Sequence, residues 1–413
     1  MPGKWTLMVY MAGYNNLSPF ALKDLEELRE VGSTEDVQVA AFVKRQETGK
    51  TERMIVRKRG EGEQVDDLGD ADSGRAQTLL DFIRWAASNV PADRYGLVVW
   101  NHGSGWQPDE LDALYEEVRS RGARDGVTPR ELGLRSSQKI GRSLFKESLA
   151  RVLELPSVSE RSIASDDGSG HSLDTIELKN VLEAATKELG GPFELLGMDA
   201  CLMSNLEVAY EASDHVRYVV GSEDLEPGDG WPYAKILQAL VDAPEMSGAD
   251  LGRTIVEEYI ASYASGSDTV TQCAVDVAAM PTFTEPFEAL AAALTERATD
   301  KDDHAEIMRA QAASAGFQGD LIDVRSFCDN LLAGAVAEPV KQRAKGVLDA
   351  LEPVGYVVAE GHRGATVEGC GGVTVYFPSP FDSVSEFYTD LSFAKKLGWD
   401  DFLAEYKRAL RGG

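Results

Sequence analysis

Cysteine is scarce in this chain, and long apolar runs are missing. The 413 residues include four cysteines, Cys201, Cys273, Cys328 and Cys370, which stand far apart. They form no Cys-x-x-Cys pair and no Cys/His ligand spacing, so neither a disulfide scaffold nor a structural zinc site is supported. No apolar run reaches the roughly 18 residues that a membrane-spanning helix needs. We therefore expect a globular chain with no membrane partner.

Positive charge is also low. The sequence has 41 Lys and Arg residues against 69 Asp and Glu residues, a formal net charge of −28. Such a chain has no net positive field to attract phosphates, so we expect no nucleic-acid partner. The negative charge would favour the approach of basic peptides, although a solvated acidic surface is the simpler interpretation.

The first residues offer only a weak match to a secretion signal. In "MPGKWTLMVYMAGYNN" one lysine is followed by a short apolar run, which passes directly into the turn and amphipathic pattern of "NNLSPFALKDLEELREV". We interpret this run as the first strand of the fold and expect a cytoplasmic protein.

Short apolar segments alternate with segments of helical period. Strands are predicted near 5–13, 37–44, 52–58, 95–101, 193–200, 216–222, 269–276, 354–359 and 372–377. Helices are predicted near 18–31, 75–89, 174–188, 204–213, 248–263, 281–298, 302–315, 336–350 and 398–410. This alternation indicates an α/β fold with a mainly parallel sheet covered on both faces.

The order of the segments suggests two domains. We place a core at 1–230, where the alternation is regular, and an α+β subdomain packed on it at 231–413. The interval 107–160 is polar and has nine Arg or Lys residues from Arg119 to Arg151. By itself this interval predicts a solvated insertion.

Two strand ends carry the residues most suited to catalysis. "LVVWNHGSGW" ends a strand at His102, and Gly103 and Gly105 would let backbone N–H groups approach a ligand. "GMDACLMSNLEVAYE" places Cys201 after a strand and just before a helix, whose N-terminus would lower the thiol pKa. Each residue alone could be structural. If the strands are neighbours, they form a nucleophile and base within reach of each other.

Rival motifs are weaker. His171 follows a "GSG" that lacks the third glycine of a dinucleotide loop. Asp166 and Glu177 are spaced like the ends of a calcium loop but lack the ligands between, and Asp174 with Glu177 is more simply a helix-capping pair. No Gly-x-Ser-x-Gly motif is present, which argues against a serine hydrolase. The remaining histidines have no nucleophile or metal-like neighbours in the sequence: His215, His304 and His362.

Several segments resemble the clostripain-like cysteine peptidases, a family with a caspase-like fold. They are "WTLMVYMAGYNNL", "DLGDADSGRAQTLLDFIRWAASNVPADRYGLVVWNHGSGW", "GMDACLMSNLEVAYE", "GSEDLEPGDGWPY", "GDLIDVRSFCDNL" and "GVTVYFP". The resemblance implies a three-layer αβα sandwich around a mainly parallel sheet, with a C-terminal α+β extension. It also implies that His102 and Cys201 are the catalytic dyad of an endopeptidase that cleaves after Arg or Lys. Asp199 holds the motif position of an acid in the S1 pocket, and Asp229 is a second candidate.

The chemistry of such a site is coherent. Cys201 would attack the scissile carbonyl, while His102 would take the thiol proton and protonate the leaving amine. The backbone N–H groups of Gly103 and Cys201 are the candidates for the oxyanion hole. The resemblance further implies self-cleavage between His102 and Cys201, where the interval 107–160 lies.

The resemblance leaves some points open. Some family members need calcium, yet this sequence offers no convincing metal site, and we expect no cofactor. The expected partners are proteins or peptides with a basic P1 residue. Two alternatives are an inactive caspase-like interaction protein and a cysteine hydrolase of non-peptide amides. An acidic S1 residue would have no purpose in a hydrolase of neutral amides.

Overall fold

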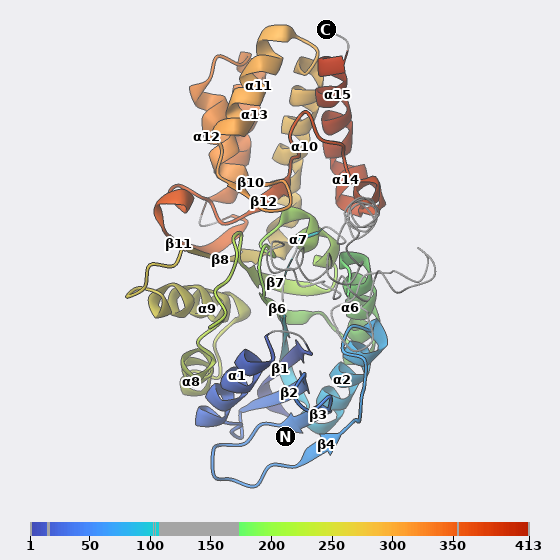
Figure 1. Cartoon of the computed structure of the whole chain (residues 1–413), viewed down its shortest axis with the longest axis vertical. Helices are drawn as coiled ribbons and strands as arrows, with labels where there is room; N and C mark the ends of the chain where they lie inside the picture. The colour runs from blue at the N-terminus through green and yellow to red at the C-terminus, as the bar shows by residue number, and fades with distance from the viewer. Residues whose placement is uncertain are drawn as a thin grey trace, which may run out of the picture. The chain divides into compact units, whose positions relative to one another are not determined.

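The computed structural model describes residues 2–14, 17–101, 103, 105–106, 173–352 and 355–411 (Figure 1). Its contacts divide the chain into two compact units. The first unit comprises Met1–Cys201 and Gly228–Met246, and the second comprises Leu202–Pro227 and Ser247–Gly413. The interval 107–160 lies outside the described residues. Both units use residues on each side of position 230, and the predicted domain boundary there stays a prediction.

The first unit is built on strands in the order β6-β5-β1-β2-β3-β4. Their bounds are β1 Gly3–Gly13, β2 Val37–Arg45, β3 Thr51–Ile55, β4 Val65–Asp67, β5 Ala92–Trp100 and β6 Phe193–Asp199. The four strands β6, β5, β1 and β2 are parallel, and β3 and β4 extend the edge antiparallel. Ten of the eleven β1 residues are buried, as expected for a strand covered on both faces.

Helices cover this sheet in two pairs. The helices are α1 Ser18–Val31, α2 Ala76–Asn89, α6 Thr175–Leu189 and α8 Tyr233–Asp242. Helix α1 packs against α8, and α2 packs against α6. Figure 1 shows the two pairs on opposite sides of the strands. The predicted αβα arrangement is therefore confirmed in this unit.

The second unit combines three antiparallel strands and a smaller sheet with many helices. Strands β7 Val216–Gly221, β8 Val270–Asp276 and β11 Val357–Arg363 pair antiparallel. Strands β9 Gly316–Phe317, β10 Leu321–Asp323 and β12 Thr374–Tyr376 form a smaller sheet. The helices are α7 Leu206–Ala212, α9 Gly248–Ser262, α10 Met280–Arg297, α11 Lys301–Ala313, α12 Val324–Ala333, α13 Glu338–Leu351, α14 Ser392–Leu397 and α15 Trp399–Arg411. This unit contains the expected C-terminal α+β part.

Helix α9 covers one face of the β7, β8 and β11 strands. Four other helices of this unit form a group (Figure 1). In it α13 packs against α10 and α12, and α10 packs against α15. Among the described helices, none has the length and apolar character needed to cross a membrane.

Candidate active site

The ends of β5 and β6 lie side by side. These strands are parallel neighbours, and Trp100 pairs with Asp199 in their register. Cys201 follows two residues after Asp199, in a turn, and its side chain is buried. His102 follows two residues after Trp100 in the sequence. His102 itself lies outside the described residues.

Gly103 lies directly against Cys201. A Cβ atom built on Gly103 would lie 1.7 Å from the carbonyl oxygen of Cys201 and 2.8 Å from its backbone nitrogen. Both contacts are with backbone, so no rotation of a side chain could relieve them, and only glycine fits at position 103. The glycine that follows His102 therefore has a packing reason as well as the catalytic one predicted for it.

The chain after Cys201 makes a sharp turn before the next helix. Leu202 has a φ of 65°, in the left-handed region that non-glycine residues rarely occupy. Its N–H donates to the carbonyl oxygen of Asp224 at 3.2 Å. Helix α7 begins only at Leu206, because Asn205 is its N-cap and accepts from the N–H of Val208. The predicted helix start near 204 is two residues too early, and four residues lie between Cys201 and Leu206, so the thiol is not in a first helical turn.

Asp199 is a buried carboxylate held by the segment 230–233. Its side chain is 4% exposed. Its Oδ2 accepts from the Tyr233 hydroxyl at 2.7 Å and from the Trp231 N–H at 3.4 Å. Gly230 has a φ of 61°, and a Cβ there would lie 3.2 Å from Oδ1 of Asp199. The backbone of Gly230 therefore covers the carboxylate closely.

A second buried acid, Asp24 of α1, accompanies Asp199. The indole N–H of Trp100 donates to Oδ2 of Asp24 at 2.7 Å, and Oδ1 has no hydrogen-bond partner among the described residues. Burial, followed by the negative charge of Asp199, raises the pKa of Asp24 to about 9. Asp24 is therefore protonated near neutral pH in this structure.

Asp24 was not predicted from the sequence. In "ALKDLEEL" it stands among other acids on an amphipathic helix, where a solvated side chain is the usual outcome. A signal was nevertheless present, because Ala21, Leu25 and Leu28 form the buried face of α1 and Asp24 lies within that face. An acid on the apolar face of a helix is unusual and indicates a buried carboxyl group.

Asp229, the second predicted S1 acid, is in a different environment. Its side chain is 68% exposed and its Oδ1 lies 2.7 Å from the ammonium nitrogen of Lys23. Asp229 and Asp199 belong to the same unit, and Asp229 directly precedes Gly230, whose backbone covers Asp199. Of the two predicted acids, only Asp199 is buried.

The other cysteines lack the features of a nucleophile. Cys273, Cys328 and Cys370 are buried. Burial raises the pKa of all three thiols, so they stay protonated near neutral pH. A protonated thiol is a poor nucleophile.

The rival motifs have structural partners where they are described. Asp174 and Glu177 form the predicted capping box of α6. The ring of His304 lies 3.0 Å from the Ala298 carbonyl oxygen, and that of His362 lies 3.1 Å from the Glu360 carboxylate. His215 makes a backbone hydrogen bond to the Ala212 carbonyl oxygen. His171 and Asp166 lie outside the described residues.

Comparison with known proteins agrees with this architecture. The sequence model of the clostripain family (Peptidase C11) matches residues 9–119 and 152–406. No curated protein matches the chain.

Three solved structures share the fold. A secreted C11 cysteine protease from Bacteroides thetaiotaomicron, in complex with an irreversible peptide inhibitor, is 19% identical, with a TM-score of 0.65 over 96% of this chain and 100% of that chain. The inactive zymogen of a C11 protease from Parabacteroides distasonis is 18% identical, with a TM-score of 0.63 over 96% and 99%. The secreted C11 cysteine protease iotapain from B. thetaiotaomicron is 17% identical, with a TM-score of 0.64 over 98% and 99%.

Two of these proteases are described as secreted, so the predicted cytoplasmic location gains no support from them and stays a prediction. The family match covers most of the sequence, including Cys201 and the strand that ends before His102. The chain therefore belongs to the clostripain family and is a cysteine peptidase.

Proposed function

We propose that this peptidase cleaves after Arg or Lys with Cys201 as nucleophile and His102 as its acid–base partner. The observation that carries the proposal is the contact of Gly103 with the backbone of Cys201. It brings the residue next to His102 against the residue that carries the thiol. The pairing of Trp100 with Asp199 supports it, since each dyad residue stands two positions beyond this pair.

In the proposed reaction the Cys201 sulfur attacks the scissile carbonyl carbon and the peptide C–N bond breaks. His102 takes the thiol proton and gives a proton to the leaving amine. The N–H groups of Gly103 and Cys201 would stabilise the negative charge on the carbonyl oxygen. Water then hydrolyses the thioester and releases the acid product.

We propose Asp199 as the charge that recognises the P1 side chain. A guanidinium or ammonium would pair with its carboxylate, a charge-assisted contact that is strongest when desolvated. Because Gly230 covers Asp199, the segment 230–233 must shift to admit the side chain. Asp229 is more exposed and would meet the basic side chain at the entrance, in exchange for its present partner Lys23.

A set of P1 reporters tests this function. Each reporter is a short peptide whose Arg or Lys is joined through its carbonyl group to a reporter amine. The wild type should cleave this bond, and Cys201→Ala should not. Removing one partner of a desolvated charge pair costs roughly 2–5 kcal/mol, so Asp199→Ala should lower kcat/KM for these reporters steeply. Asp229→Ala is the comparison variant and should lower kcat/KM much less, because the pair that Asp229 would form with the substrate is partly solvated.

Each alternative has its own result in this assay. If reporters with Ala or Asp at P1 are cleaved as well as those with Arg or Lys, the proposed preference for a basic P1 residue is wrong. No cleavage of any peptide by a folded wild type would favour an inactive interaction protein. Release of ammonia or amine only from non-peptide amides would favour the amide hydrolase. If Asp229→Ala alone had the effect, the specificity residue would be Asp229.

A further inference from the structure

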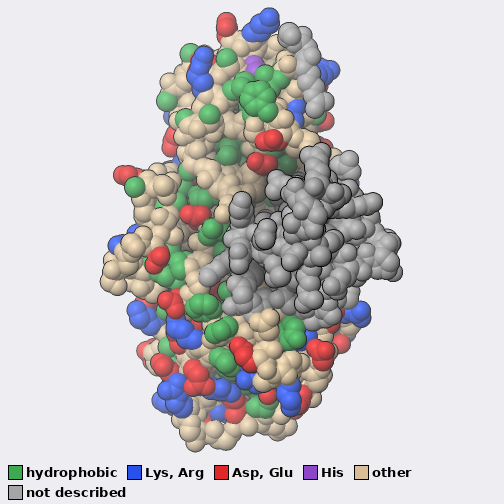
Figure 2. Space-filling model, viewed as in Figure 1, with side chains coloured by type: hydrophobic (Ala, Val, Ile, Leu, Met, Phe, Trp, Pro, Cys, Tyr) green, Lys and Arg blue, Asp and Glu red, His purple; other side chains and the backbone are tan. Residues whose placement is uncertain are grey.

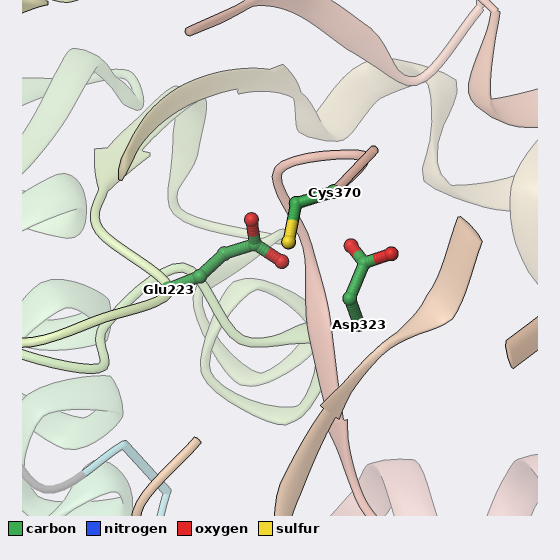
Figure 3. Close-up of side chains that lie close together, drawn as sticks. All are labelled: Glu223, Asp323 and Cys370. Atoms are coloured by element: carbon green, nitrogen blue, oxygen red, sulfur yellow. The ribbon is translucent and has the colours of Figure 1, made fainter. Parts of the chain in front are cut away.

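A second group of reactive side chains lies in the interior of the second unit. Glu223, Asp323 and Cys370 each offer one ligand atom, and these atoms lie within 4.8 Å of one another. None of the three side chains is more than 3% exposed. Figure 3 shows the Glu223 carboxyl group and the Cys370 thiol pointing toward each other, with the Asp323 carboxyl group beside them. The three residues come from segments far apart in the sequence.

The hydrogen bonds of this cluster are incomplete. Asp323 is fixed, because Oδ1 accepts from the Ser326 N–H at 2.6 Å and Oδ2 accepts from the Gly371 N–H at 2.8 Å. The Glu223 carboxyl group lies beside the Asp323 carboxyl group and the Gly372 N–H, but neither of its oxygens makes a well-formed hydrogen bond with the residues that the structure describes. A buried polar group without a partner is costly, and a buried unpaired carboxylate more so. The position calls for either a retained proton or a cation.

The charges around Glu223 favour a cation. Burial, and next the charge of Asp323, raise the pKa of Glu223. Glu360 adds negative charge to the same place, whereas Arg325 is a positive group that acts on Asp323. Two carboxylates and a thiolate together would carry more negative charge than this one guanidinium offsets.

We propose that Glu223, Asp323 and Cys370 bind a divalent transition-metal cation such as Zn²⁺. Carboxylate oxygen and thiolate sulfur are both ligands of zinc, and three protein ligands leave a fourth position for water. Calcium does not fit, since it takes roughly six to eight oxygen ligands. Zinc–ligand distances of about 2.0–2.3 Å put tetrahedral ligand atoms about 3.5 Å apart, so separations that are now at most 4.8 Å would shorten by no more than about 1 Å on binding.

The cation would stabilise the turn that follows the nucleophile. Asp224, next to Glu223, accepts the hydrogen bond from Leu202. Gly372, two residues after Cys370, accepts one from the Ser204 hydroxyl. The segments that carry two of the three ligands therefore hold residues 202–204. The effect on catalysis rests on the proposed role of Cys201, whereas metal binding itself does not.

Cobalt binding tests the site without any measurement of peptidase activity. Co²⁺ is titrated into reduced Cys201→Ala, which removes the proposed nucleophile as a competing thiol, and the thiolate-to-cobalt charge-transfer absorption is recorded. We expect one equivalent to produce the band, Zn²⁺ to displace it, and Zn²⁺ to raise Tm. Adding Cys370→Ser should abolish the band, and adding Glu223→Gln should weaken binding at least tenfold.

The remaining thiols are the matched controls. Cys273→Ser and Cys328→Ser, each in the Cys201→Ala background, should keep the band. If the parent Cys201→Ala protein shows no band and no rise in Tm, the cluster holds only a proton and the proposal is wrong. If the band depends on Cys273 or Cys328 and survives Cys370→Ser, the ligand set is wrong. Circular dichroism of each variant separates loss of binding from loss of folding.

Discussion

At the residue scale, the site depends on close backbone contact and on buried acids. The strand ends and the close approach of Gly103 to Cys201 could be predicted from the sequence, because glycine and cysteine follow apolar runs in recognisable motifs. The burial of Asp24 could not, since it depends on how α1 packs against β1 and β2 and on the hydrogen bond from Trp100 of β5. The burial of Asp199 could not be predicted either, because it depends on the segment 230–233, about 30 residues later in the sequence.

The pKa of Asp24 gives a prediction for stability. Its folded pKa of about 9 lies above its ordinary 3.8, so the folded state binds more protons between these values. The free energy of unfolding therefore falls as pH rises through this window, and the contribution is lost progressively above pH 4. Asp24→Asn keeps an acceptor for Trp100 and removes this titration.

We expect Asp24→Asn to raise Tm relative to the wild type at pH 8 and to differ little at pH 4. Thermal unfolding across this range measures the effect. Asp229→Asn, which changes an exposed acid of the same unit, is the control and should show no such trend. An equal Tm difference at pH 4 and pH 8 would mean that Asp24 titrates normally.

At the element scale, most strands and helices fall where the apolar period placed them, within a few residues. α1 covers the predicted 18–31, and β6 differs from its prediction by one residue. Helix α8 was missed although Tyr233, Ile236, Leu237 and Leu240 form a buried stripe. It follows directly after the "GDGWP" turn, and this segment was interpreted as part of the substrate site. Strands β9 and β10 are too short to show any period.

The interval 107–160 carries a prediction of its own. The family match leaves out residues 120–151, all within this interval, which supports an insertion. Polar, glycine-containing segments tolerate cleavage, and this one has nine basic residues that the proposed enzyme would recognise. They are Arg119, Arg121, Arg124, Arg130, Arg135, Lys139, Arg142, Lys146 and Arg151. We predict self-cleavage after one of them, with both fragments remaining associated.

Intact-mass analysis after size-exclusion chromatography measures this. The wild type should give two co-eluting fragments and Cys201→Ala a single chain. A wild type that stays whole while fully active would show that no cut is needed. Fragments in Cys201→Ala would show that another protease makes the cut.

At the scale of the whole molecule, the α/β class and the C-terminal α+β part follow from the order of segments. The bounds of the two units could not be predicted, because each unit gathers residues distant in the sequence. Figure 2 shows Lys and Arg side chains lying among Asp and Glu side chains on the face that it draws. The excess of acids is therefore not gathered into one patch on this face.

The net charge of −28 still creates a long-range field. It should attract basic substrates, and salt screens such attraction over about 10 Å at 0.1 M ionic strength. We predict that kcat/KM falls with added NaCl for a reporter with extra lysines outside P1. A reporter with the same P1 residue and neutral flanking residues is the control. Equal salt dependence of the two would show that the field does not assist binding.

We propose Cys201 as the activated thiol and His102 as its partner. The most direct test is the rate at which each of the four cysteines in the folded protein is alkylated by iodoacetamide near neutral pH, read by peptide mass mapping. We predict that Cys201 reacts first and that Cys273, Cys328 and Cys370 stay unmodified. In His102→Ala, alkylation of Cys201 should be slower, and turnover should fall by about 10²-fold or more. Faster reaction at another cysteine, or Cys201 alkylation and turnover unchanged in His102→Ala, would contradict the account.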